Sequence, residues 1–341
     1  MIGGMARAVV ATAYGGPEVL DVIAVEPGPL RSGEVLVDVR AAGVNPADWK
    51  QYSGAWGTDQ ANLPMRLGHE AAGVIAAVAD APDDAPDDDL TVGAEVIAFP
   101  ARGAYADQIV VPRSALLPKP AAMSWEKAAG LMFSGVTAVH TLAATRVGAG
   151  DTVLVHGASG GVGAMIVQLA RARGARVIGT ADPANHEYLV DLGAVPVGYG
   201  PGLVDRVRAA AHGNLTAAID VSGTREALDA SVTLVHDRRR VATIAGMAYG
   251  AQLGIKVLGS GPGADPGTEI RDAARATLVR YVEQGKVHVR VGATYQLAEA
   301  ARAHRAGIEG RVQGKIILVP RDQGDGRQAQ SRSLLHPLRG R

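Results

Sequence analysis

The stretch DTVLVHGASGGVGAMIVQLARARGARVIGTAD, residues 151–182, contains the pattern that decides the fold. A strand rich in Val and Leu ends at Gly157, and a glycine-rich loop follows it. From Val162 to Ala170, apolar residues recur with the i, i+3, i+4, i+7 spacing of one helix face. A second apolar strand then ends at Thr180. A strand, a loop, a helix and a strand in this order predict one βαβ unit of a parallel sheet.

The glycine loop reads as G-x-G-x-x-G with alanine at its first place. Gly160 allows the backbone to approach a pyrophosphate, and Gly163 allows the helix and the strand to pack closely. Unpaired N–H groups and the positive end of the helix dipole would face the phosphates. We therefore predict that the loop binds a dinucleotide; a glycine-rich turn without a ligand is the alternative. The residues expected to form the loop are Ala158, Ser159, Gly160, Gly161, Val162 and Gly163.

The remaining chain divides into a β-rich part and an alternating part. Before Pro120, short Val- and Ile-rich segments are separated by Gly, Pro, Asp and Asn, which predicts strands. After it, strand and helix patterns alternate, which predicts an α/β fold with a doubly wound parallel sheet. A helix is expected over residues 124–144, with Ser124 as its N-cap. We expect the acidic stretch 79–90 to be a solvated loop rather than a cation site, and residues 321–341 to be a disordered tail.

The composition excludes several classes of function. At 341 residues, the chain has the length of about two domains. Lys plus Arg and Asp plus Glu both number 34, so no basic field exists to bind nucleic acid. The absence of cysteine excludes disulfides, thiolate metal sites, iron–sulfur clusters and a cysteine nucleophile. The sequence has no uncharged apolar run of about 18 residues and no signal-peptide pattern, so we expect no membrane association and a cytoplasmic location.

Five sequence blocks, in order along the chain, carry a family resemblance. Over about residues 5–320, the chain resembles the medium-chain dehydrogenase/reductase superfamily, in its zinc-independent quinone oxidoreductase (zeta-crystallin-like) branch. Five ordered blocks are far more specific than any one of them. They are GVNPADWK (43–50), LGHEAAGVI (67–75), SGVTAVHTL (134–142), HGASGGVGAMIVQLA (156–170) and GRVQGKIIL (310–318).

The resemblance implies two domains. A GroES-like β-barrel catalytic domain would consist of residues 1–123 and 265–320, and a Rossmann domain of residues 124–264 would be inserted between them. NADPH would lie in the cleft between the domains, with NADH not excluded. The resemblance also implies a homodimer, with paired edge strands around Ile255–Leu258 as its seam.

The segment Gly68-His69-Glu70 resembles the metal motif of the zinc-dependent branch of the superfamily. A catalytic zinc needs three protein ligands, usually two thiolates and a histidine in that branch. The resemblance places Asn45 and Ser134 where those thiolates would be. We therefore predict no metal site, and we expect His69 and Glu70 to be buried, hydrogen-bonded groups or part of the cleft wall.

The resemblance also implies roles for cofactor-binding residues. Thr137 would contact the nicotinamide end, and Thr180, Ala181 and Asp182 would lie beside the adenosine ribose. Tyr199 would lie near the 2′-phosphate or the adenine. The other positions implied are Ser222 under the adenine, Ala245, Gly246 and Met247 in the turn that meets the carboxamide, and Asn45 and Lys315 at the cleft.

The choice between NADPH and NADH depends on two residues that depart from the family pattern. Asp182 stands where the family often has serine or glycine, and an acid there favours the ribose 2′-hydroxyl of NAD. His186 stands where the family often has lysine. Together with Asn185, His186 could meet a 2′-phosphate, although histidine is a weak cation at neutral pH. NADPH is the expected cofactor, and the choice stays open at this point.

Without zinc, the enzyme lacks the Lewis acid that ionises an alcohol. Hydride delivery to a quinone or an α,β-unsaturated carbonyl fits the remaining chemistry. The resemblance places Asn45 near the nicotinamide and the substrate carbonyl, and Tyr52 on the substrate side. The alternatives are that Asn45 only caps a turn and that Tyr52 only packs. Asp48 and Lys50 are expected to form a surface or loop-bracing pair.

Three functions are therefore considered for the chain. The first is an NAD(P)H-dependent reductase of quinones or enones. The second is an enoyl reductase or tailoring reductase of a biosynthetic pathway, which uses the same hydride step on a larger substrate. The third is a dinucleotide-binding protein without turnover, with a structural or regulatory role.

Overall fold

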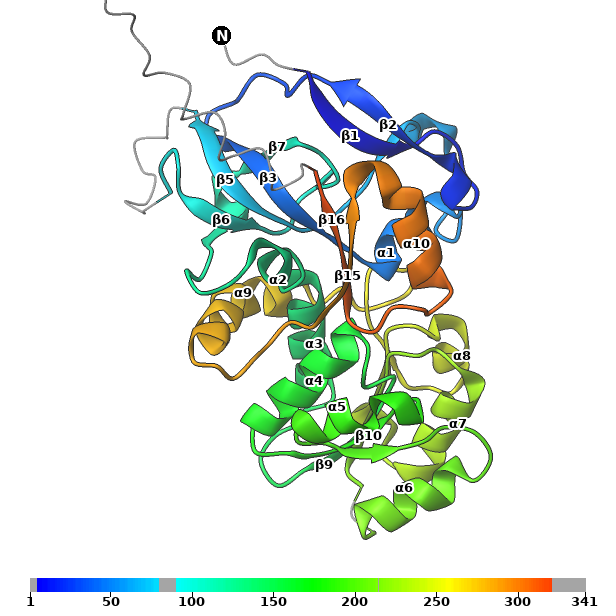
Figure 1. Ribbon diagram of the computed structural model, residues 1–341. Coiled ribbons are helices and arrows are strands. Elements are labelled where there is room, and N and C mark those ends of the chain that lie inside the picture. The colour runs from blue at the N-terminus through cyan, green and yellow to red at the C-terminus, as the bar shows by residue number, and fades with distance from the viewer. Residues whose placement is uncertain (1–4, 80–89, 214, 321–341) are drawn as a thin grey trace, which may run out of the picture.

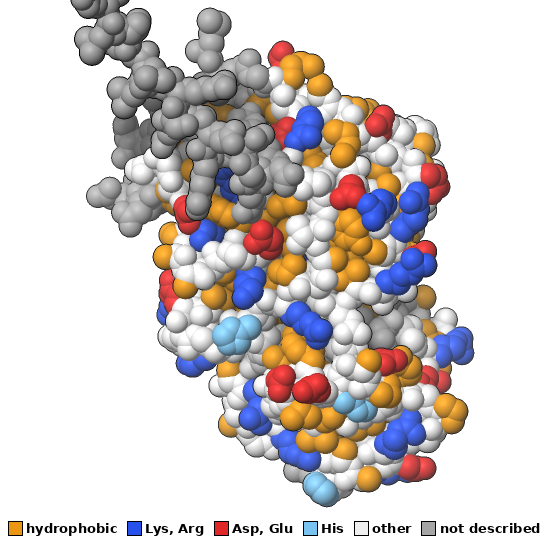
Figure 2. All heavy atoms as spheres, in the orientation of Figure 1, with side chains coloured by type: hydrophobic (Ala, Val, Ile, Leu, Met, Phe, Trp, Pro, Cys, Tyr) orange, Lys and Arg blue, Asp and Glu red, His pale blue; other side chains and the backbone are white. Residues whose placement is uncertain are grey.

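The computed structural model describes residues 5–79, 90–213 and 215–320. The predicted tail 321–341 and all but the two ends of the predicted acidic loop 79–90 lie outside the described residues. Within these ranges, no helix has the length and apolar character needed to cross a membrane. On the face shown in Figure 2, acidic and basic side chains are interspersed.

The glycine-loop strand β9 lies inside a parallel sheet of six strands. The sheet order is β11-β10-β9-β12-β13-β14, and every pair in it is parallel. Numbered along the chain, this is the order 3-2-1-4-5-6 of a Rossmann fold, so the predicted doubly wound sheet is confirmed. The strands are β9 (Thr152–His156), β10 (Arg176–Thr180), β11 (Val195–Val197), β12 (Ala217–Asp220), β13 (Val241–Thr243) and β14 (Lys256–Val257).

Helices cover both faces of this sheet. The sheet and its helices form the lower half of the molecule in Figure 1. The predicted βαβ unit is confirmed, because α4 joins β9 to β10. The helices are α3 (Met132–Ala144), α4 (Gly161–Ala172), α5 (His186–Asp191), α6 (Leu203–Ala211), α7 (Arg225–Leu234) and α8 (Met247–Gln252).

The upper half of Figure 1 consists mainly of a second, mostly antiparallel sheet. Its order is β15-β16-β3-β5-β6-β8, and β7 also pairs with β3. The last strand of the described chain, β16, therefore lies beside β3, which belongs to the first part of the chain. These strands are β3 (Glu34–Val44), β5 (Ala71–Val78), β6 (Glu95–Ala98), β7 (Gln108–Pro112), β8 (Leu116–Pro118), β15 (Val291–Gln296) and β16 (Lys315–Val319).

A small third sheet and four further α-helices belong to the rest of the described chain. Helix α9 lies within a segment predicted for the barrel domain, but it packs against α3. The exact domain boundaries stay a prediction. The remaining elements are β1 (Ala6–Ala11), β2 (Leu20–Val25), β4 (Met65–Arg66), α1 (Pro46–Tyr52), α2 (Trp125–Ala129), α9 (Thr268–Glu283) and α10 (Ala300–Ile308).

The helix predicted over residues 124–144 is interrupted, which corrects the sequence-based expectation. Ser124 caps α2 as predicted, because its side chain accepts from the amide of Lys127. The chain then leaves the helix at Gly130 and begins α3 at Met132. The interruption places the backbone N–H of Phe133 on the Glu70 carboxylate, 2.8 Å from Oε2. A carboxylate at this position satisfies a free amide of the first turn and favours the helix dipole.

Gly163 and Gly160 should respond differently to the same substitution. A Cβ atom at Gly163 would lie 2.2 Å from the Gly157 carbonyl oxygen, whereas a Cβ at Gly160 would lie 3.5 Å from it. We expect Gly163→Ala to lower the free energy of unfolding by about 1–3 kcal/mol, as overpacking does, and Gly160→Ala to change it little. Urea unfolding of both variants measures this, and equal stabilities would contradict the close packing of the start of α4 against the loop.

Candidate functional site

A cavity of about 810 Å³ lies where the two large sheets meet. This volume is within the range of about 300–1,000 Å³ that is typical of small-molecule sites. Its wall includes the start of α1, the start of α3, the loop between β9 and α4, and the ends of β10 and β12. The segment before β16 is also part of the wall, as are the start of α7, residues 258–260 and Arg271 of α9.

The glycine loop forms the middle of the cavity wall. Ser159 to Gly163 all line the cavity, and Gly160 is the N-cap of α4, which no side chain caps. The first amides of α4 are therefore available to an anionic ligand. Ala158 is fully buried behind the loop and does not line the cavity.

Two buried polar atoms in this wall have no hydrogen-bond partner among the described residues. They are Nε2 of His156 and Oδ1 of Asn185. His156 ends β9, and its Nδ1 lies 3.2 Å from the Thr180 hydroxyl. Burial lowers the pKa of His156 to about 4, and the charges of Asp220 and Glu226 oppose this shift only in part. A buried polar group without a partner is costly. A polar ligand in the cavity, such as a dinucleotide, would give both atoms a partner.

The end of the cavity at β10 carries oxygen acceptors. Asp182 and Glu226 are exposed and line it, together with Tyr199. The Asp182 carboxylate accepts from the Ala184 amide at 2.9 Å and from the Tyr199 hydroxyl at 3.4 Å. His186 does not line the cavity, and its Nε2 contacts the Ala181 carbonyl oxygen at 3.4 Å. His186 therefore stands outside the cavity wall, and its contact with a 2′-phosphate stays a prediction.

Most of the other predicted cofactor residues lie in the wall, and two do not. Ala245 and Gly246 lie behind it, because their amides donate to the Thr243 hydroxyl, while Ile244 and Met247 face the cavity. Of the predicted carboxamide turn, Met247 therefore lines the cavity and Ala245 and Gly246 do not. The predicted residues that line the cavity are Asn45, Thr137, Ser159, Gly160, Gly161, Val162, Gly163, Thr180, Ala181, Asp182, Tyr199, Ser222, Met247 and Lys315.

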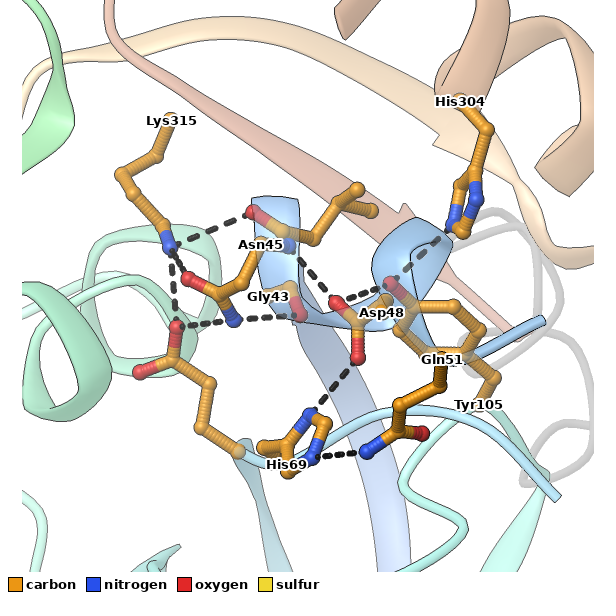
Figure 3. Close-up of polar contacts among 10 residues, drawn as sticks. Gly43, Asn45, Asp48, Gln51, His69, Tyr105, His304 and Lys315 are labelled. Atoms are coloured by element: carbon orange, nitrogen blue, oxygen red, sulfur yellow. Dashed lines mark hydrogen bonds and ion pairs between the residues drawn. The ribbon is translucent and has the colours of Figure 1, made fainter. Parts of the chain in front are cut away.

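On the α1 side of the cavity lies a buried polar cluster, which consists of Asn45, Glu70 and Lys315 (Figure 3). The Lys315 ammonium donates to Glu70 Oε1 at 2.9 Å, to Asn45 Oδ1 at 2.5 Å and to the Val44 carbonyl at 3.3 Å. The Asn45 side-chain N–H groups donate to Glu70 Oε1 at 3.1 Å and to the Gly43 carbonyl at 3.3 Å. Both hydrogens of the Asn45 amide are therefore used inside the protein.

The face of α1 that points away from the cavity takes part in a second buried network of hydrogen bonds. Asp48 Oδ2 accepts from the Asn45 backbone N–H and the Tyr105 hydroxyl, both at 2.7 Å. His69 Nδ1 lies 2.7 Å from Asp48 Oδ1. The expected Asp48–Lys50 surface pair is thus wrong, because Asp48 is fully buried and Lys50 lines the cavity. Burial opposes the charges of both Asp48 and His69, but their mutual contact lowers the pKa of Asp48 and raises the pKa of His69.

Tyr52 belongs to this second network and not to the cavity. Its side chain is fully buried, and its hydroxyl lies 2.8 Å from His304 Nδ1. The placement of Tyr52 on the substrate side is therefore wrong, since two residues along a helix separate Tyr52 from Lys50 by more than half a turn. His304 Nε2 lies 3.2 Å from the Tyr105 hydroxyl. Because Tyr105 donates to Asp48, the hydrogen bonds assign the proton of neutral His304 to Nε2.

Burial lowers the pKa of His304 to about 4, against the charge of Asp48. The unfolded chain, with a histidine pKa of about 6.5, therefore takes up this proton first as the pH falls. Neutral His304 stabilises the fold fully above about pH 6.5, and this contribution is lost between there and the folded pKa.

We expect His304→Gln to be less stable than the parent protein at about pH 7 but to lose less stability between about pH 7 and 4.5. The difference in that loss should be about 2–3 kcal/mol. Urea unfolding of both proteins at the two pH values measures it. His156 titrates with the same sign in both proteins and cancels. Equal losses in parent and variant would show that folding does not lower the pKa of His304.

Three features of the cavity wall were not predicted from the sequence: the presence of His156, the presence of Glu226 and the cavity-facing position of Lys50. His156 had a usable signal, since it is the last residue of the strand before the glycine loop. Lys50 could have been found by helical phase, because Pro46 and Lys50 are four residues apart on α1. Glu226 had no signal of comparable strength.

A barrel-type sheet beside a Rossmann sheet, with a cavity between them at the glycine loop, defines a dinucleotide-binding oxidoreductase of two domains. The sequence family described as an alcohol dehydrogenase GroES-like domain matches residues 31–121, and the family described as a zinc-binding dehydrogenase matches residues 161–260. The GroES-like and Rossmann fold class predicted from the sequence is thereby confirmed.

Similar proteins agree with this class. A quinone oxidoreductase of Pseudomonas aeruginosa is 31% identical over 345 residues, which cover 93% of this chain and 100% of the relative. A solved mycobacterial structure described as complexed with NADPH is 30% identical with a TM-score of 0.78, over 92% of this chain and 100% of the other. An erythronolide synthase of Saccharopolyspora erythraea is 39% identical over 188 residues, 52% of this chain and 5% of that protein. The chain belongs to the medium-chain dehydrogenase/reductase superfamily, in its quinone oxidoreductase branch, and is an oxidoreductase.

Proposed function

We propose that the protein transfers hydride from a reduced nicotinamide dinucleotide to a quinone or an α,β-unsaturated carbonyl without a metal ion. The observation that carries the proposal is the composition of the cavity wall. An uncapped helix N-terminus and an unpartnered His156 nitrogen lie at its middle, and neutral or cationic side chains line its α1 side. The helix N-terminus and the His156 nitrogen suit a dinucleotide. The α1 side suits an acceptor that becomes negative during reduction.

The proposal of a metal-free reaction rests on the donor atoms present. Within the described ranges, no group of three or more His, Asp and Glu side chains is placed to hold an ion. Glu70 is bound to the Lys315 ammonium, and His69 is bound to Asp48. A cation at Glu70 would have to displace another cation, and no thiolate exists in the chain to compensate.

The chain's own residues would bind and orient the dinucleotide. Amides of the glycine loop would hold its diphosphate, and the end of the cavity at Asp182 and Tyr199 would hold its adenosine ribose. A bound reduced dinucleotide would supply the hydride. Lys315 and Glu70 hold Asn45 rigidly beside this space, because each of its side-chain hydrogen bonds is buried.

A reductase of a biosynthetic pathway is the second candidate, and the match to part of an erythronolide synthase favours it. It would use the same hydride step on a larger acceptor. We also propose a homodimer formed through β14, which ends the parallel sheet in the described strand order. Size-exclusion chromatography with light scattering tests the dimer.

The first test is absorbance at the nicotinamide band with a panel of quinones and enones. We expect turnover with these acceptors, and none with saturated ketones or simple alcohols, because the site lacks a Lewis acid. Addition of a chelator should leave the rate unchanged. A rate that falls on chelation and returns with zinc would overturn the metal-free reaction, and binding of the dinucleotide without any turnover would favour the non-catalytic role.

The ribose end of the cavity bears on the choice of cofactor, for which NADPH was expected. Asp182, Glu226 and Oδ1 of Asn185 are all hydrogen-bond acceptors there. A ribose 2′-hydroxyl can donate to such groups, but a 2′-phosphate offers negative charge and acceptors only. The cations in the wall, Lys50, Arg271 and Lys315, stand on other elements of the fold: α1, α9 and β16.

Arg206 does not change this balance. Its guanidinium already donates to carbonyl oxygens of Gly198, Gly200 and Pro201, in the loop that carries Tyr199. We therefore propose that the protein takes up NADPH less readily than NADH, which revises the expectation drawn from the family resemblance.

We expect a lower Kd for NADH than for NADPH, and a change in this ratio by about tenfold or more toward NADPH in Asp182→Ser. Calorimetric titration with each oxidised and reduced dinucleotide measures it without turnover. Asp205→Ser is the matched control, because Asp205 is an exposed carboxylate outside the cavity wall. Tighter binding of NADPH by the parent protein would contradict the proposal.

A further inference from the structure

The face of α1 that points into the cavity carries a lysine. Pro46, Ala47 and Lys50 line the cavity, whereas Asp48 and Tyr52 are fully buried on the other side. Residues four apart share a helix face and residues two apart do not. The helix therefore directs Lys50, and not Tyr52, toward the space where an acceptor would bind.

Two other polar residues of the cavity wall, Asn45 and Lys315, have already used their donors. Both hydrogens of the Asn45 amide are bound to Glu70 and Gly43, and its oxygen accepts from Lys315. The three N–H groups of Lys315 are bound to Val44, Asn45 and Glu70. Neither residue can donate to an acceptor without breaking a buried hydrogen bond, which is costly.

The Lys50 ammonium has no hydrogen bond and no ion pair with any residue in the described ranges. Its side chain is half-buried. Burial lowers the pKa of the ammonium, because the charged form loses part of its hydration. Such a group is a better proton donor than an exposed lysine, and its N–H groups are free for a ligand.

The other charged groups of the wall fit this role less well. Arg271 cannot give up a proton, since a guanidinium stays charged in proteins. The Lys315 ammonium is held by Glu70. Asp182 follows β10 and Glu226 follows β12, so both stand on the parallel-sheet side of the cavity. His156 lies beside the glycine loop and is neutral, because burial lowers its pKa.

We infer that Lys50 donates the proton that neutralises the acceptor oxygen during reduction, an inference that rests on the function proposed above. When hydride adds to the β-carbon of an enone, the electron pair of the carbon–carbon double bond shifts and the carbonyl oxygen becomes an enolate. The Lys50 ammonium transfers a proton to that oxygen and becomes a neutral amine. The enol then returns to the ketone by proton exchange with water, and the amine takes a proton from solvent.

The test compares Lys50→Met, Lys50→Arg and the control Lys286→Met, all with the same enone and the same quinone. Methionine keeps the apolar stem, so the fold should be retained, which a thermal melt checks. Lys286 is a suitable control because it packs over the Tyr281 ring, outside the cavity wall. We expect Lys50→Met to lower kcat for the enone by about 10²–10⁴-fold, the usual range of general-acid catalysis. The loss with the quinone should be smaller, because a hydroquinone anion is a weaker base than an enolate and takes its proton from water more readily.

Three further readouts separate donation from a structural role. The Kd of the dinucleotide should stay within about twofold in Lys50→Met, whereas an increase of tenfold or more would assign Lys50 to a cofactor phosphate and overturn the inference. Lys50→Arg should recover KM but not kcat, because arginine donates a hydrogen bond without releasing its proton. Small alkylammonium salts should raise kcat of Lys50→Ala and not that of the parent.

The two levels of the proposal fail in different ways. Unchanged enone turnover in Lys50→Met would overturn the role of Lys50 while leaving the reductase function in place. A parent protein that binds the dinucleotide but reduces neither acceptor would overturn the reductase function and the role of Lys50 with it.

Discussion

The buried ion pair between Lys315 and Glu70 is the contact on which the site depends. It joins the C-terminal strand β16 to the segment before β5, and through the Phe133 amide it also anchors the start of α3. The stem of Lys315 lies against the start of α4, because a Cβ at Gly161 would be 3.2 Å from Lys315 Cδ. Removing one member of such a pair typically costs about 3–5 kcal/mol, because a buried charge is left without its partner. The pair thus sets the spacing between the glycine loop and α1.

His69 and Glu70 show how the fold uses two adjacent polar residues for two separate purposes. Glu70 faces Lys315 and Asn45, and His69 faces Asp48 on the other side of the start of α1. Buried, hydrogen-bonded groups or part of the cleft wall were expected here; Glu70 is buried and hydrogen-bonded, whereas His69 is hydrogen-bonded but partly exposed, and neither lines the cavity. Together the two networks hold both faces of a helix of only seven residues, too short to be stable by itself. The orientation of Lys50 is therefore determined by buried contacts of its neighbours.

The sequence predicted the parts of the protein whose contacts are local. The parallel sheet, the glycine loop and the position of Asp182 follow from periodicity and spacing within about 32 residues of chain, which is why they were found. The partner of Tyr52 is His304, 252 positions away, and no local pattern carries that contact. The same holds for the break in the helix at Gly130, where the free amide of Phe133 meets a carboxylate from another part of the chain. Helix α1 was missed because seven residues beginning with Pro46 contain barely two turns of periodicity.

The division of the cavity between two sheets has a consequence for the chemistry proposed here. The groups assigned to the dinucleotide stand mainly on the parallel sheet and its loops, while Lys50 stands on α1 beside the antiparallel sheet. Hydride and proton would then reach the acceptor from two sides of the cavity. Because Asp182 and Lys50 stand on different elements and share no contact, the preference for a dinucleotide and the transfer of the proton can be changed independently, and energies of substitutions at the two positions should add.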